Sequence, residues 1–104
     1  MPPNDQVISY PGEVLYSEFM RPLKLTANEL ALALKVPPSR ITTIINGERA
    51  VSADTALRLA RYLNTTAEYW LHMQVAYDLA KARMEFGKQI ITDIPVSSRL
   101  LFPY

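Results

Sequence analysis

The chain has 104 residues, of which 49% are hydrophobic and 20% are charged, and its formal net charge is +1. This composition is typical of one globular domain and excludes an intrinsically disordered chain. The absence of cysteine excludes disulfides, thiolate nucleophiles and cysteine-ligated zinc. No apolar run approaches the ~18 residues of a membrane span, and residues 1–10 lack the basic start and apolar core of a signal peptide. We therefore expect a cytoplasmic protein without membrane association.

Positive charge is concentrated in the middle of the chain. Residues 21–61 carry seven basic and three acidic side chains, whereas the flanking segments are acidic or neutral. A basic segment is compatible with a nucleic-acid partner, although chance alone explains an excess of this size.

Two helices are expected before residue 35, after an irregular arm over residues 1–10. The first begins at Pro11, and Pro22 ends it because proline cannot donate and its ring clashes with the preceding turn. The second begins at a capping box formed by Thr26 and Glu29. Its apolar stripe consists of Leu30, Ala31 and Leu34.

A third, short helix is expected to open at Pro38 or Ser39 and to stop at Asn46 and Gly47, which both tolerate the left-handed conformation. Its inward residues would be Ile41, Ile44 and Ile45.

A fourth helix is expected between a cap at Ser52 and a stop at Asn64, and a fifth begins at a capping box of Thr65 and Glu68. The apolar stripe of the fourth would be Ala53, Ala56, Leu57, Ala60 and Leu63. We expect the fifth helix to end at about Phe86. Residues 88–104 form a tail that is an extended strand, a packed arm or a disordered end.

The second and third helices have the spacing of a helix-turn-helix. Ala31 is the small residue wanted where two helices cross, and Ile41, ten residues later, is a β-branched plug for the core. Lys35 stands in the turn where glycine is usual, which indicates strain or a different turn. Other helical hairpins satisfy some of these offsets, so the spacing alone is moderately specific.

The outward face of the third helix carries side chains that suit base recognition in the major groove. We expect base contacts from Ser39, Arg40, Thr42 and Thr43. Arg40 could bond bidentately to guanine, while serine and threonine are permissive readers. We expect phosphate contacts from Thr26, Asn46 and Arg49. The alternative is a merely solvated polar face.

Six separated blocks resemble the HigA/VapI type of antitoxin, within the Xre, lambda-repressor-like group. The blocks are Pro-Gly-Glu-Val-Leu at 11–15, Leu-Thr-Ala-Asn-Glu-Leu-Ala at 25–31, Val-Pro-Pro-Ser-Arg-Ile at 36–41, Ile-Asn-Gly at 45–47, Ala-Asp-Thr-Ala-Leu-Arg-Leu-Ala at 53–60 and Thr-Ala-Glu-Tyr-Trp-Leu at 66–71. In this group histidine is common before Pro-Gly-Glu, whereas this chain has Tyr10. Residues 88–104 match no pattern of the group.

The resemblance implies an all-α, five-helix, lambda-repressor-like DNA-binding domain over residues 11–87. It further implies a dimeric antitoxin that blocks a small RNA-cleaving toxin of the RelE-like group and binds operator DNA to repress their shared operon.

The fifth helix carries two apolar faces. One consists of Trp70, Met73, Tyr77, Ala80 and Met84, and the other of Leu71, Val75, Leu79, Ala82 and Phe86. The core of the domain explains one face, so the second needs another cover. We expect a homodimer interface at Leu71, Val75, Leu79 and Phe86. The alternative is that residues 88–104 fold back over this face.

An enzyme is not expected, because no nucleophile, base and oxyanion donors can be assembled. His72 is the only histidine, and no metal site or cofactor is predicted. Two other functions stay open: a stand-alone Xre-type regulator without a toxin, and a protein-binding module that does not bind DNA.

Overall fold

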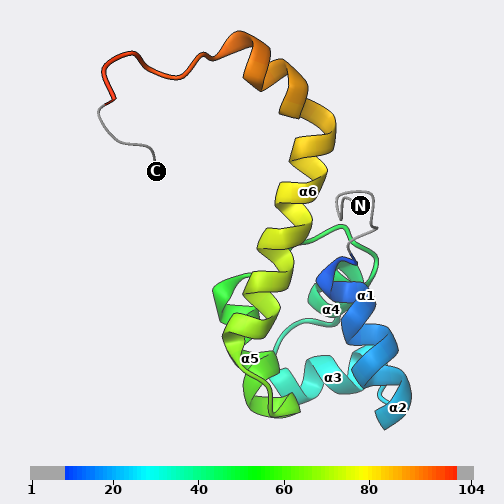
Figure 1. The fold of residues 1–104 in the computed structure, drawn as a ribbon. Coiled ribbons are helices and arrows are strands. Elements are labelled where there is room, and N and C mark those ends of the chain that lie inside the picture. The colour runs from blue at the N-terminus through cyan, green and yellow to red at the C-terminus, as the bar shows by residue number, and fades with distance from the viewer. Residues whose placement is uncertain (1–8, 101–104) are drawn as a thin grey trace.

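A computed structural model of the chain describes residues 9–100, so most of the expected arm and the last four residues of the tail lie outside the described residues. Five helical segments, and no strand, occupy the described part of the chain (Figure 1). The first segment combines α1 (Pro11–Val14), the π-helix η2 (Leu15–Met20) and α2 (Arg21–Leu23). The others are α3 (Ala27–Leu34), α4 (Pro38–Ile45), α5 (Ala53–Leu63) and α6 (Ala67–Asp93). The expected all-α, five-helix fold is confirmed.

The first helical segment continues past Pro22, where we expected it to end. The backbone N–H of Arg21 bonds to the carbonyl of Tyr16, one residue further back than in an α-helix. This wider π turn accommodates the proline ring, which would otherwise clash with the carbonyl four residues earlier. The segment ends instead at Lys24, whose φ of 56° is left-handed.

The turn between α3 and α4 has Lys35 in a left-handed conformation, with a φ of 62°. Both bonds of the predicted capping box at Thr26 and Glu29 are present at the other end of α3. The turn is closed by the backbone N–H of Val36, which donates to the Ala31 carbonyl at 3.0 Å. The chain therefore forms the turn that glycine normally permits, at the cost of a strained left-handed backbone at Lys35.

Side chains from every helical segment meet in one core. The largest fully buried ones are Trp70, Leu15, Leu30, Ile41, Ile44, Leu59, Thr55 and Pro11. Of the three predicted inward residues of α4, Ile41 and Ile44 are confirmed, whereas Ile45 is only half-buried. The indole N–H of Trp70 donates to Thr65 at 2.8 Å, which satisfies the one polar atom of its ring.

The predicted apolar stripe of α5 is confirmed at Ala56, which is fully buried, and Leu63 packs against the core, but two of its members were wrong. Leu57 is 64% exposed and Ala53 is exposed, while Thr55 and Leu59 are buried. Thr55 can be buried because Ser52, the N-cap, bonds both its backbone N–H and its hydroxyl. The core thus takes a hydroxyl satisfied by the N-cap, while Leu57 faces solvent.

Both predicted ends of the last helix were wrong. The N-cap is Thr66, which accepts from the backbone N–H of Tyr69, so Thr65 and Glu68 do not form a capping box. The helix runs through Gly87 to Asp93, because a glycine in a helix interior costs only about 1 kcal/mol. It ends where Ile94, the residue before Pro95, adopts an extended conformation.

The last helix projects beyond the rest of the molecule (Figure 1). Its N-terminal half packs against α5 and α1, whereas its C-terminal half and the described part of the tail lead away from the domain. The tail residues 94–100 are exposed. Among the residues described, no helix is both long and apolar enough to cross a membrane.

Candidate nucleic-acid interface

The polar face of α4 lies opposite the side that enters the core. Ile41 and Ile44 are held against α3 and α1, and Ile45 packs at the edge of the core, so the polar side chains of this helix lie on its other side. Of the four predicted base readers, Ser39 and Thr42 are exposed, and Arg40 and Thr43 are half-buried. A helix whose back is fixed in the core and whose front carries short polar side chains has the geometry that enters a major groove.

The two threonines of this face are held by their own helix. The hydroxyl of Thr43 donates to the Ser39 carbonyl at 2.6 Å, and the hydroxyl of Thr42 donates to the carbonyls of Pro38 and Ser39 at 3.4 and 3.3 Å. Each oxygen still has lone pairs to accept from a base, and each methyl group can contact thymine.

The guanidinium of Arg40 is tied to the scaffold. Its Nη1 donates to Oδ2 of Asp54 at 3.1 Å, and 30% of the Arg40 side chain is exposed. The sequence alone does not predict this pair, because Asp54 stands in the first turn of α5, where an acidic residue is expected for the helix dipole alone.

The three predicted phosphate contacts are spread over two elements. Asn46 and Arg49 are exposed in the loop after α4, and within residues 9–100 no ion pair involves Arg49. Thr26 caps α3, and its hydroxyl oxygen already accepts from Glu29 at 3.1 Å. A phosphate near Thr26 could therefore accept a hydrogen bond from the Thr26 O–H or from the free backbone N–H groups at the start of α3.

Two residues outside the prediction fix the position of α4. The hydroxyl of Tyr10 donates to the Ile45 carbonyl at 2.8 Å, and Gly12 is so close to Ile44 that a Cβ on Gly12 would overlap the Ile44 carbonyl oxygen. The sequence marks this region through the Pro-Gly-Glu block that follows Tyr10. Residue spacing alone, however, does not predict that the block contacts the end of α4.

The predicted dimer face is largely uncovered in the single chain. Val75, Leu79 and Phe86 are 54%, 46% and 54% exposed. Leu71 differs, because it is half-buried and packs against the core. The described part of the tail does not cover this face, since it leads away from the domain (Figure 1).

The opposite face of α6 enters the core only in its first half. Trp70 is buried and Tyr77 is half-buried, but Met84 is 84% exposed. The expectation that this whole face is covered by the domain was wrong for Met84, because α6 has left the domain at that point.

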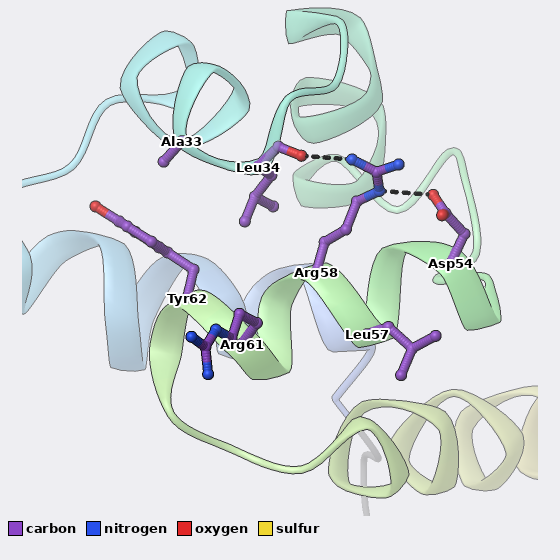
Figure 2. A pocket seen from close by; sticks show the side chains of 7 residues that line it. All are labelled: Ala33, Leu34, Asp54, Leu57, Arg58, Arg61 and Tyr62. Atoms are coloured by element: carbon purple, nitrogen blue, oxygen red, sulfur yellow. Dashed lines mark hydrogen bonds and ion pairs between the residues drawn. The ribbon is translucent and has the colours of Figure 1, made fainter.

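A shallow groove of about 490 Å³ lies between α3 and α5. It is lined by Ala33, Leu34, Asp54, Leu57, Arg58, Arg61 and Tyr62 (Figure 2). Figure 2 shows Arg58 reaching from α5 to the Leu34 carbonyl on one side and to Asp54 on the other. Within the described range, no three histidine, aspartate or glutamate side chains gather as a metal site would require.

Sequence and structure comparisons both find helix-turn-helix proteins, among them antitoxins, as similar to this chain. Residues 17–70 match the helix-turn-helix family. The chain is 47% identical over 95 residues to virulence-associated protein I of Dichelobacter nodosus, which covers 91% of this chain and 87% of that protein.

Two solved structures are similar over most of their length. The antitoxin HigA of Pseudomonas aeruginosa with the higBA promoter has a TM-score of 0.84 and 39% identity, and covers 88% of this chain and 100% of that one. An addiction module antidote protein of the HigA family from Coxiella burnetii has a TM-score of 0.81 and 41% identity, with 95% and 100% covered.

Proposed function

Since the chain belongs to the HigA/VapI-type antitoxins of the Xre helix-turn-helix family, we propose that it binds operator DNA in its own promoter and represses that operon. The family is non-enzymatic, which confirms the expectation that the chain is not an enzyme. The observation that carries the proposal is the polar face of α4, fixed from behind by Ile41 and Ile44. The similar HigA structure, which includes promoter DNA, supports it.

In this proposal α4 lies in the major groove. Ser39, Arg40, Thr42 and Thr43 contact base edges. Asn46 and Arg49, in the loop that follows, contact phosphates, and so does the α3 N-terminus at Thr26. Base contacts determine sequence preference, whereas phosphate contacts bind any duplex and weaken as salt rises.

A second copy of the chain covers the exposed face of α6. Val75, Leu79 and Phe86 form its centre, and Leu71 lies at its edge against the core. In a two-fold dimer each protomer offers the same face, and the two α4 helices meet half-sites separated by roughly one turn of DNA, about 34 Å.

The antitoxin activity is directed at a small RNA-cleaving toxin of the RelE-like group, in the cytoplasm. Membership of the HigA type supports this partner. Co-expression with the neighbouring reading frame tests it: the two products co-purify if the proposal is right. A neighbouring product that neither binds this protein nor inhibits growth would leave a stand-alone regulator.

Operator binding is tested with purified protein and its own upstream promoter DNA. Fluorescence anisotropy at two salt concentrations compares the promoter duplex with a scrambled duplex of the same composition. We expect tighter binding to the promoter, and on both duplexes weaker binding at the higher salt concentration. Equal affinity for the two duplexes would contradict sequence-specific repression, and no binding to either would favour a protein-binding module.

A further inference from the structure

A chain of hydrogen bonds links α4, the helix proposed to enter the major groove, to the end of α3 through two residues of α5. Oδ2 of Asp54 accepts from Nη1 of Arg40 at 3.1 Å and from Nε of Arg58 at 3.0 Å. Arg58 in turn donates through its own Nη1 to the Leu34 carbonyl at 2.8 Å (Figure 2). From this arrangement we propose that Asp54 is a positioning residue for Arg40, and that it determines how strictly the protein selects its operator. The inference rests on the proposed function.

The anchoring at the far end makes Asp54 a fixed support. Its other partner, Arg58, has an anchor outside this pair, because its Nη1 donates to the carbonyl of Leu34, the last residue of α3, at 2.8 Å. Arg40 therefore meets a carboxylate that is already oriented, and less rotamer freedom of its long side chain remains to be lost when DNA binds.

The pair leaves Arg40 able to bind a base. A guanidinium has five N–H donors, and Asp54 uses only one of them. The free donors can still form the bidentate contact to O6 and N7 of guanine that arginine makes in the major groove.

The charges predict the direction of the effect. The Asp54 carboxylate beside α4 repels phosphates and offsets the charge of Arg40, so it lowers affinity for every duplex. Arg40 without Asp54 would be a free cation on a flexible stem that can bind any phosphate within its reach. Removal of the carboxylate should therefore strengthen binding to scrambled DNA and weaken the preference for the promoter. Loss of a purely structural contact would not produce this combination.

The test uses Asp54→Asn and Asp54→Ala in the full chain. Affinities are measured for the promoter, a scrambled duplex and promoter duplexes in which each guanine is replaced in turn. We expect the promoter-to-scrambled affinity ratio to fall on the order of fivefold or more in Asp54→Ala and by less in Asp54→Asn, which keeps an acceptor oxygen. We also expect the penalty of one guanine replacement to shrink.

Three controls separate positioning of Arg40 from charge, from folding and from effects that do not involve Arg40. Glu48→Gln removes an equal charge from the loop after α4, and it should raise affinity for all duplexes alike without changing the ratio. Thermal unfolding followed by circular dichroism identifies any variant that is not folded at the assay temperature. In an Arg40→Ala background, Asp54→Asn should leave the ratio unchanged, because the residue that it positions is gone.

The outcomes are distinct. A ratio that stays within twofold of wild type in both Asp54 variants, or that falls equally in the Arg40→Ala background, overturns this inference alone. Wild-type protein that shows no promoter preference overturns the proposed function, and this inference with it.

Discussion

The hydroxyl of Tyr10 donates to the carbonyl oxygen of Ile45, the last residue of α4, across 35 positions of sequence and a distance of 2.8 Å. The same ring meets the edge of Tyr77 at a centroid distance of 5.9 Å and lies against Gly47, the residue that turns the chain after α4. Tyr10 therefore joins three parts of the molecule: the entry to α1, the end of α4 and the middle of α6.

Replacement of Tyr10 by phenylalanine tests the weight of that hydrogen bond. The Tyr10→Phe variant keeps the ring contacts but leaves the Ile45 carbonyl without this donor. We expect the free energy of unfolding to fall by about 1 kcal/mol, measured by urea denaturation. Tyr16→Phe is the matched control, because Tyr16 is 47% exposed, and it should have no measurable effect. Equal stability of the two variants would show that the Tyr10 bond contributes nothing.

Two glycines should respond in opposite directions to alanine. Gly12 is buried where α1 meets α4, and its new Cβ would overlap the backbone carbonyl of Ile44, which cannot move alone. We expect Gly12→Ala to lower the free energy of unfolding by roughly 1–3 kcal/mol, as overpacking does. At Gly87 the nearest atom to a new Cβ is the Cβ of Arg83, at 3.9 Å.

The Gly87→Ala substitution should therefore raise the free energy of unfolding by about 0.5–1 kcal/mol, because alanine is more stable than glycine in a helix interior. The same denaturation assay compares both variants with wild type. If Gly87→Ala also lowers the free energy of unfolding, α6 is not helical at Gly87 in solution. If Gly12→Ala does not lower the free energy of unfolding, α1 and α4 do not approach each other as closely as the structure has them.

Lys35 should be a site of stored strain. A lysine at a φ of 62° pays a penalty that glycine avoids, although glycine loses more chain entropy on folding. We expect Lys35→Gly to raise the free energy of unfolding by up to about 1 kcal/mol, read as a higher melting temperature. Lys81→Gly, in the interior of α6, should lower it by a similar amount and serves as the control. A Lys35→Gly variant no more stable than wild type would mean that the lysine side chain compensates for its backbone.

Local signals predicted most of the fold. Caps at Thr26 and Ser52 and the stop at Asn64 are contacts within one turn, and each was found from spacing alone. The buried face of α5 was predicted correctly at Ala56 but wrongly at Leu57, because a satisfied hydroxyl, that of Thr55, is buried in the core instead.

The missed parts of the site are contacts between distant segments. Arg40 and Asp54 are 14 residues apart, and Tyr10 and Ile45 are 35 apart. Composition and periodicity describe one helix at a time, so they place Arg40 on an outward face without saying which carboxylate stands beside it. The end of α6 is a local miss: it was predicted at about Phe86, before Gly87, whereas the helix continues to Asp93 and ends at Ile94, the residue before Pro95.

The exposed face of α6 predicts how assembly and DNA binding are coupled. In a two-fold interface Leu79 of each protomer would lie close to the axis with Val75 and Phe86, so Leu79→Asp buries two carboxylates in one apolar contact. We expect this variant to sediment as a monomer at tens of micromolar, a concentration at which we expect wild type to be a dimer, and to lose affinity for a two-half-site promoter. Met84→Asp adds the same charge at a residue that is 84% exposed on another face, and it should stay dimeric. Because a single half-site needs only one α4, both variants should bind it as wild type does. A dimeric Leu79→Asp variant with full promoter affinity would place the interface elsewhere.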